Sequence, residues 1–130
     1  MKIKIHVTIE NENQMENENQ VMTEYIASLE RGELSAETLG LTLKESKIIN
    51  SEIQKKMIDC QVKDYVSRHR FCSCCGSILS IKGSNSLIYR TLFGKIDLKS
   101  PRLFTCKCQS QVQSSFSPLS PVLKDHILLN

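Results

Sequence analysis

The sequence predicts an α+β fold. An N-terminal strand and helical segment with a long amphipathic helix is followed by a small three-stranded zinc ribbon with four cysteines at its ends. Residues 2–10 alternate strictly, residues 42–69 contain no Gly or Pro, and two close-set cysteine pairs flank a hairpin-sized segment. We expect a strand plus helical region at 1–70, the ribbon at 71–109 and an extended tail at 110–130.

The N-terminal residues 2–10 alternate between aliphatic and polar side chains, with the aliphatic ones running from Ile3 to Ile9. This period of two predicts a half-buried strand, and a lone strand needs a pairing partner in water. His6 lies on the polar face, so we expect an exposed strand residue rather than a ligand.

Residues 11–41 combine a low-complexity segment with two expected helices. The stretch 11–20 is polar and acidic, which predicts a flexible loop. A helix is expected next and would end at Gly32. Its apolar residues recur at helical spacing and are Val21, Tyr25, Ile26 and Leu29. Ser35 is a candidate cap for a short helix through Leu39.

A long helix is expected to begin at Thr42, where Thr42 and Glu45 form a capping-box pattern, and to continue for about 25 residues to His69. Its apolar stripe includes Cys60 as a small apolar residue. We favour packing of the stripe on the preceding elements. The alternative is a helical pair between two chains, but the heptad is imperfect.

The second half of the chain predicts short strands separated by turns. We expect strands at Ile78–Lys82, Leu87–Phe93 and Ile96–Lys99, with turns at 83–86 and 94–95. Pro101 indicates an edge strand or a bulge, since proline has no N–H for a ladder.

Charge is divided unevenly along the 130 residues. Residues 1–64 carry 8 Lys/Arg and 12 Asp/Glu, whereas residues 65–130 carry 9 and 2, so the basic half is suited to a polyanionic partner. No apolar run reaches the roughly 18 residues of a membrane span, and the N-terminus lacks a signal-peptide core. We therefore expect a cytoplasmic protein without a membrane partner, in which thiols stay reduced.

The chemistry is concentrated in the cysteines. Cys72-x-x-Cys75 is followed by Gly76, and Cys106-x-Cys108 lies downstream beyond the predicted strands. Two such pairs are typical of a structural Zn²⁺ site, because zinc favours four thiolates in a tetrahedron. Four ligands leave no open position, so we expect a structural and not a catalytic ion.

Alternatives to this ligand set remain open at this point. Cys74 could replace Cys75, but with Cys75 as ligand, Gly76 supplies the flexible position just after it. His69 is a weaker alternative ligand, and Cys106-x-Cys108 is shorter than a usual C-x-x-C pair. Disulfides are the competing interpretation and would require an oxidising compartment.

Basic residues lie on or beside the expected ribbon and are our candidate contacts to DNA phosphates. The alternative is an ordinary solvated face. The eight candidates are Arg68, Arg70, Lys82, Arg90, Lys95, Lys99, Arg102 and Lys107.

Several short motifs resemble bacterial insertion-sequence transposases of the ISKra type. They include the two cysteine pairs, Lys82-Gly83, Arg90-Thr91-Leu92-Phe93-Gly94 and Ser100-Pro101-Arg102-Leu103. Similar segments stand at Leu29-Glu30-Arg31-Gly32, Thr38-Leu39-Gly40-Leu41 and Ser115-Phe116-Ser117-Pro118-Leu119.

The resemblance implies the N-terminal part of such a transposase, which recognises double-stranded DNA at element ends and associates with the nucleoid. In that family a downstream RNase H-like domain with a DDE triad and Mg²⁺ performs strand transfer. After Asp64 only Asp97 and Asp125 are acidic, so we expect a truncated, catalytically inert form and not an enzyme. The competing expectation is a protein-interaction module that forms homodimers through the long helix.

Overall fold

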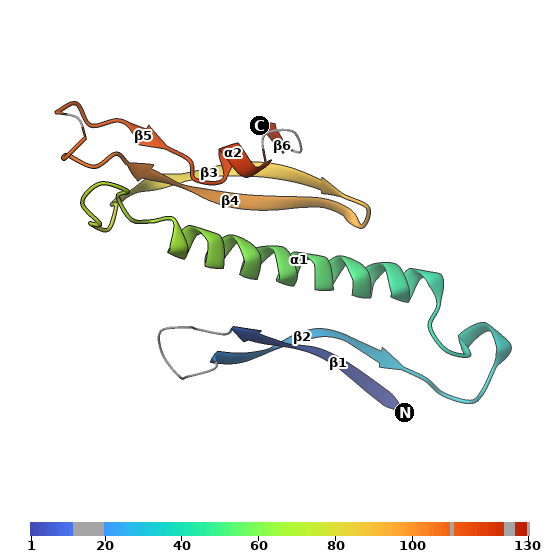
Figure 1. Cartoon of the computed structure of the whole chain (residues 1–130). Helices are drawn as coiled ribbons and strands as arrows, with labels where there is room; N and C mark the ends of the chain where they lie inside the picture. Colours follow the sequence, from blue (N-terminus) through green and yellow to red (C-terminus); the bar gives the residue numbers. More distant parts are fainter. Residues whose placement is uncertain (12–19, 110, 124–126, 130) are drawn as a thin grey trace. The chain divides into compact units, whose positions relative to one another are not determined.

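A computed structural model describes residues 1–11, 20–109, 111–123 and 127–129 (Figure 1). They form two compact units, Met1–Met57 and Ile58–Asn130, and each is described by itself. The fold is mixed α+β with a long helix, as predicted, and its strands form small antiparallel sheets. Most of the expected polar loop, residues 12–19, lies outside the described residues, while Asn11 and Gln20 belong to strands.

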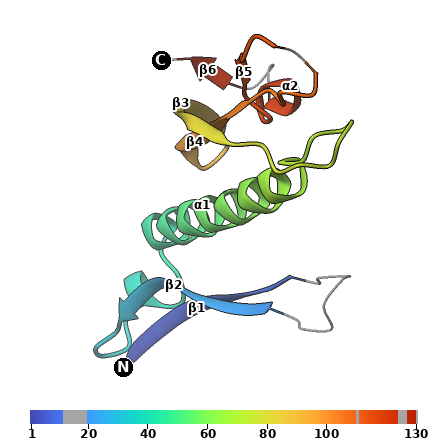
Figure 2. The same ribbon diagram turned by 90° about the vertical axis from the view of Figure 1, so that its left-hand side faces the viewer.

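The first unit is built on an antiparallel hairpin of β1 (Lys2–Asn11) and β2 (Gln20–Glu30), visible in Figures 1 and 2. The predicted β1 is confirmed, and His6 is exposed, with its ring against the edge of Tyr25 at 5.7 Å between centroids. The expected helix from Val21 is wrong, because this segment is β2.

Pairing explains why β2 is a strand. β1 requires a partner, and ten residue pairs join it to β2, from Lys2 opposite Glu30 to Asn11 opposite Gln20. The register shifts once: Ile5 faces Ala27 and His6 faces Tyr25, so Ile26 is the extra residue of a bulge on β2. Ile26 is buried, which is how this bulge contributes to the core.

A short 3₁₀ turn, Ala36–Thr38, leads into helix α1 (Leu43–Arg68). The predicted capping box is confirmed: the Thr42 amide donates to Glu45 Oε1 at 2.9 Å, and the Glu45 amide donates to Thr42 Oγ1 at 3.1 Å. The Ser35 hydroxyl makes no capping hydrogen bond to a backbone amide of the turn, and it bonds the Thr38 hydroxyl at 2.7 Å instead.

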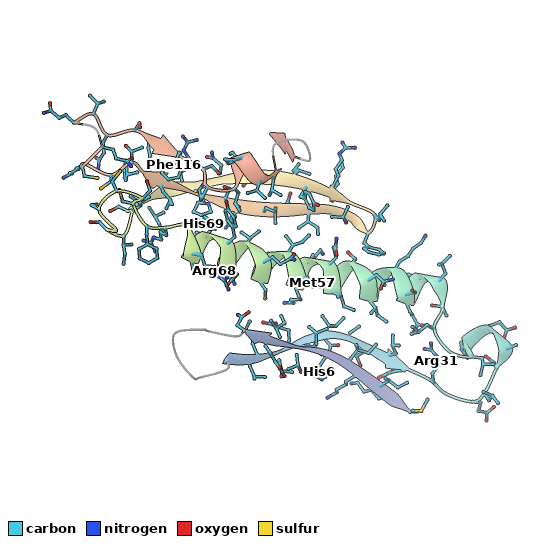
Figure 3. All side chains as sticks on the ribbon, in the orientation of Figure 1. His6, Arg31, Met57, Arg68, His69 and Phe116 are labelled. Atoms are coloured by element: carbon cyan, nitrogen blue, oxygen red, sulfur yellow. The ribbon has the colours of Figure 1, made fainter. Side chains whose placement is uncertain are left out.

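Arg31, labelled in Figure 3, connects the end of the hairpin to the start of α1. Its guanidinium forms a bidentate ion pair with Glu45 and donates to the backbone carbonyls of Thr38 and Gly40 at 2.9 and 2.8 Å. Glu45 therefore serves the helix cap and the ion pair together. This clamp was not anticipated from the sequence.

Helix α1 has the predicted length, but the prediction of one continuous amphipathic stripe along it is wrong. Ile49 and Ile58 are both buried, yet nine residues separate them, which places them about half a turn out of phase. Met57, which belongs to the predicted stripe, is half exposed. Ile49 belongs to the first compact unit, and Ile58 belongs to the core of the second.

The second unit contains a four-stranded antiparallel sheet in the order β5-β4-β3-β6. β3 (Ile81–Thr91) and β4 (Gly94–Phe104) form a long hairpin, flanked by β5 (Ser115–Phe116) and β6 (Ile127–Leu129). Thus the three short strands expected within 71–109 are replaced by two long ones. The turn expected at 83–86 is wrong, because those residues pair with β4.

Two clusters form the core of this unit. Ile58 and Val62 of α1 pack with Leu87, Ile96 and Leu98, and Leu123 of the short helix α2 (Ser120–Leu123) contacts the same cluster. The second cluster joins Leu79 and the fully buried Leu103 to Cys72 and Cys106.

The residues around β5 fasten to β4 by side-chain hydrogen bonds. Ser100 and Ser117 share a hydroxyl bond of 2.5 Å, and Arg102 Nη2 donates to Ser115 Oγ at 3.0 Å. Pro101 lies in β4 beside β3, and β5 pairs with β4 further on, at Leu103 and Phe104. Among the described residues, β4 therefore pairs only with β3 at Pro101, in line with the predicted edge position.

Among the described residues, no helix combines the length and apolar character that crossing a membrane requires.

Candidate metal centre and basic strand face

The first cysteine pair is held by a tight loop closed by the Phe71–Ile78 bridge. Within it the Cys72 amide donates to the Ser77 carbonyl at 2.8 Å, and the Gly76 amide donates to the Cys72 carbonyl at 3.0 Å. Gly76 has φ of +70°, a conformation that L side chains rarely adopt. The loop therefore needs glycine directly after Cys75, as the sequence argument assumed.

The second pair follows the end of β4, where the Gln109 amide donates to the Cys106 carbonyl at 3.1 Å and closes a turn. This turn makes the short Cys106-x-Cys108 spacing workable, since it carries both sulfurs to the loop of the first pair. Cys72 Sγ lies 3.5 Å from Cys108 Sγ, and Cys75 Sγ lies 3.4 Å from Cys106 Sγ.

All four sulfurs lie within 4.8 Å of one another, so this group could hold a metal ion. With Zn–S bonds of about 2.3 Å, a tetrahedron has S···S edges of about 3.8 Å, which falls between the observed short contacts and the upper limit. All six cysteines are free, and the sulfur contacts are far longer than the roughly 2.05 Å of a disulfide.

Local hydrogen bonds favour thiolates on the first loop. The backbone N–H groups of Cys75 and Cys74 lower the pKa of Cys72, and the Cys74 amide lies 3.4 Å from its sulfur. The Ser77 hydroxyl, 3.2 Å from Cys75 Sγ, is the main reason that the pKa of Cys75 falls to about 6. Ser77 was not singled out from the sequence.

Crowding acts in the opposite direction on Cys108. Hydrogen bonds between the Cys108 thiol and the sulfurs of Cys106 and then Cys72 favour its protonated form and raise the pKa of Cys108, which is a penalty on its thiolate. A bound cation would remove this penalty, because metal ions stabilise coordinated thiolates.

The alternative ligands lie outside the cluster. Cys74 is exposed and its sulfur accepts a hydrogen bond from Gln109 Nε2 at 3.2 Å. His69 stacks on Tyr65 with ring centroids 3.9 Å apart, and its Nδ1 lies 2.8 Å from the Tyr65 carbonyl oxygen. Cys60 is half-buried on α1.

The structure places three of the eight candidate DNA contacts on one face of the β3–β4 hairpin. Arg90 lies directly opposite Lys95. Lys99 lies opposite Ser86, which is the second pair further along on the same face. Directly opposite residues share a face, and the alternate pairs such as Leu87 with Leu98 face the core. The three cations are exposed, and Asp97 is on the same face between the two lysines.

The other five candidates are distributed elsewhere. Arg68 pairs with Asp64 at 3.2 Å, Arg70 Nε donates to the Leu79 carbonyl at 3.1 Å, and Arg102 bonds Ser115. Lys82 Nζ lies 6.0 Å from the centre of the Phe104 ring. Lys107 is exposed between the two cysteines of the second pair.

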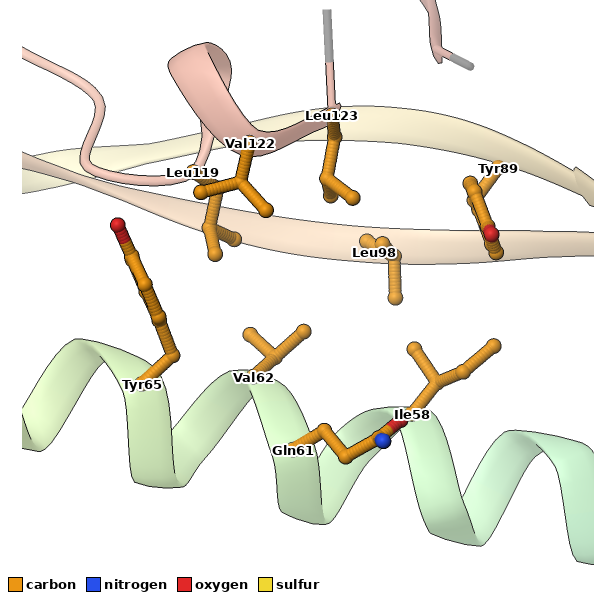
Figure 4. A pocket seen from close by; sticks show the side chains of 9 residues that line it. All are labelled: Ile58, Gln61, Val62, Tyr65, Tyr89, Leu98, Leu119, Val122 and Leu123. Carbon is orange, nitrogen blue, oxygen red and sulfur yellow. The ribbon is translucent and has the colours of Figure 1, made fainter.

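An apolar pocket of about 250 Å³ opens between the second half of α1, α2 and the sheet (Figure 4). Its lining includes Ile58, Val62, Leu98, Leu119 and Leu123. Among the described residues that line it there is no carboxylate, imidazole or thiol, and most of the lining is aliphatic.

Fold and site together define an α+β protein with a four-cysteine cluster of metal-binding geometry and a basic face on a β-hairpin. No family model, curated protein or solved structure matches the chain.

Proposed function

We propose that the chain is a zinc-dependent module that binds double-stranded DNA through the exposed face of the β3–β4 hairpin. Cys72, Cys75, Cys106 and Cys108 would hold Zn²⁺, since thiolates at these separations suit zinc better than the harder cations. A filled four-thiolate site leaves no position for a substrate. The ion would therefore fix the end of the hairpin and take no part in catalysis.

The observation that carries the DNA proposal is the pair of like charges at Arg90 and Lys95. Like charges directly opposite in a sheet are unfavourable, and Lys99 on the same face adds a third. A polyanion with regularly spaced phosphates turns this cost into attraction. A two-stranded ribbon also fits the major groove of B-DNA in width.

The tip of the hairpin extends this surface. Leu92 is 98% exposed and Phe93 45%, on a turn where Gly94 has φ of +115° and the Thr91 hydroxyl donates to the Gly94 carbonyl at 2.9 Å. In the major groove, exposed apolar side chains such as phenylalanine can contact thymine methyl groups. We assign the tip to the same interface.

The biological setting that we propose is the N-terminal, DNA-recognising part of an insertion-sequence transposase, without catalytic function of its own. The support is the resemblance of the cysteine, Arg90–Gly94 and Ser100–Leu103 motifs. The Ser100–Leu103 motif has a structural role here, because Ser100 and Arg102 form side-chain hydrogen bonds to Ser117 and Ser115 of the similar segment at 115–119.

The test measures binding of the zinc-loaded chain to labelled duplex DNA by fluorescence anisotropy over a series of salt concentrations. Substituting Arg90→Ala, Lys95→Ala and Lys99→Ala together should weaken binding at least roughly tenfold. It should also lower the steepness of log K against log salt by about 2.7, since each lost phosphate contact removes about 0.9.

The matched control removes three exposed lysines of α1, Lys44→Ala, Lys47→Ala and Lys63→Ala, and keeps the same net charge as the hairpin variant. It should bind within a few-fold of the native chain. Equal losses in both variants would reject the hairpin face, and no binding to any duplex would reject the function. A preference for DNA that flanks the gene over scrambled duplex would support the transposase setting, and equal affinity would oppose it.

A further inference from the structure

The outer edge of β1 is open in the described part of the chain, where β1 and β2 form a two-stranded sheet. Met1 and Arg31 exchange both backbone hydrogen bonds at 2.9 Å, so the odd-numbered residues of β1 bond toward β2. The even-numbered residues therefore direct their N–H and C=O groups to the open edge. These residues are Lys2, Lys4, His6, Thr8 and Glu10.

This edge is regular over its whole length. The single bulge of the hairpin places its extra residue, Ile26, on β2, so β1 has no irregularity that would prevent another strand from pairing. Natural proteins protect such edges with bulges, prolines or charges. β1 has no bulge and no proline, and its charges are of both signs, at Lys2, Lys4 and Glu10.

The sequence of β1 is complementary to itself when it is reversed. With His6 opposite His6 of a second copy, Lys2 lies opposite Glu10, and Lys4 lies opposite Thr8. The symmetry of the pair repeats each contact, so two opposite-charge pairs form at the ends of the ladder. In this register the hydrogen-bonded pairs are formed by even-numbered residues, as the outward N–H and C=O groups require.

We infer that β1 pairs with β1 of a second copy of this chain, antiparallel and centred on His6. The five facing pairs would form about ten backbone hydrogen bonds and join the two hairpins into a four-stranded sheet. On the other face, Ile3 would lie opposite Ile9 and Ile5 opposite Val7. The aliphatic side chains of the two β1 strands would then contact each other across the interface. The contact is isologous, as a twofold dimer requires.

The edge of β2 fits a second copy less well. β2 contains two carboxylates, Glu24 and Glu30, and no cation, so pairing two β2 strands creates no opposite-charge contact. It also carries the bulge at Ile26, and bulges bend an edge away from pairing. This difference selects β1 as the interface.

The oligomeric state tests the inference. We expect sedimentation of the full chain at micromolar concentrations to show a monomer–dimer equilibrium. Thr8→Pro removes an outward N–H without touching the bonds to β2 and should give a monomer, while Thr8→Val should keep the dimer. A native chain that stays monomeric, or a Thr8→Pro chain that still dimerises, overturns the inference.

A charge swap tests the register with variants that leave the ladder intact. Lys2→Glu places like charges opposite each other twice and should raise the dissociation constant about tenfold. Adding Glu10→Lys to it restores both pairs and should return the constant to near its native value. Failure of the double variant to recover affinity overturns the register.

Cross-linking fixes the centre of symmetry independently, in a background with Cys60→Ser and Cys74→Ser. His6→Cys should form an intermolecular disulfide under mild oxidation, because residues paired across strands lie about 5.5 Å apart at Cα. Thr8→Cys is the matched control, and it faces Lys4 rather than itself. Equal cross-linking at both positions overturns the proposed register.

Discussion

The two compact units contain different kinds of tertiary clamp. In Met1–Met57, Arg31 and Glu45 join the hairpin, the 3₁₀ turn and the start of α1 through an ion pair and carbonyl bonds. In Ile58–Asn130, four cysteines join the loop before β3 to the turn after β4. Both clamps connect segments that are distant in sequence and lie at the end of a hairpin.

The difference lies in what each clamp needs. The Arg31–Glu45 pair is complete within the chain, and its strength depends on pH and salt because both partners are charged. The four cysteines could hold a metal ion, and their thiolate charges would repel one another, so we expect the strength of this clamp to depend on a bound cation. The second unit should therefore respond to metal supply and the first to acid.

The largest expected effect comes from breaking the cysteine cluster. Cys72→Ser removes a buried sulfur ligand and should abolish stoichiometric zinc binding, which supplies an apparent ~10–16 kcal/mol coupled to folding in small zinc domains. Hydrogen exchange should then increase across residues 71–109 and remain slow at the start of α1. Zinc content is measured by atomic emission, and exchange by mass spectrometry.

Cys74→Ser is the matched control, because its exposed sulfur lies outside the cluster. It should retain one zinc per chain and native exchange. If this variant lost zinc while Cys75→Ser retained it, Cys74 would be the ligand and Cys75 the spare thiol.

A smaller effect is expected from the apolar residue that packs behind the cysteines. Leu103 is fully buried against Cys72 and Leu79, so Leu103→Ala should cost about 2–5 kcal/mol of the free energy of unfolding of this unit. Leu92→Ala on the exposed tip should change it by less than about 0.5 kcal/mol. Urea-dependent hydrogen exchange measures both, and similar values for the two would contradict the described core.

The smallest effect concerns the pH dependence of the first unit. Arg31 is the main cause that lowers the pKa of Glu45 from 4.5 to about 2. The stabilisation from this carboxylate is therefore complete above about pH 4.5 and is lost as the pH falls through about 2. Glu45→Gln should lower the Tm at pH 7, with a difference from the native chain that shrinks in acid.

Glu52→Gln provides the comparison for that measurement. Glu52 forms a more exposed pair with Lys55 at 3.3 Å, one turn apart on α1, and such pairs contribute little. Its substitution should leave the Tm nearly unchanged at every pH. A pH trend equal to that of Glu45→Gln would show that general charge, rather than the Arg31 clamp, is responsible.

The features predicted correctly from the sequence are those set by local chemistry. The capping box depends on Thr42 and Glu45 alone, and the two cysteine pairs depend on short spacings with Gly76 at a position that requires glycine. The four sulfurs chosen from the sequence are those that the structure brings together. Zinc itself and the DNA contacts remain predictions.

The errors concern long-range pairing. Val21, Tyr25 and Ile26 satisfy a helical spacing, but β1 provides a ladder that local propensity does not describe. The Gly83–Ser86 segment has turn composition, yet β4 pairs with it residue by residue. Arg31 could not be assigned from the sequence, because its partners become neighbours only when the hairpin and α1 fold together.

Helix α1 is hydrogen-bonded without interruption across the boundary between Met57 and Ile58. Helical order is cooperative, since each residue beyond the first turn adds a bond to a structure that is already nucleated. A substitution that breaks the helix near Thr42 is therefore expected to reduce helical order beyond Ile58 as well, because the two units share one continuous run of helical hydrogen bonds.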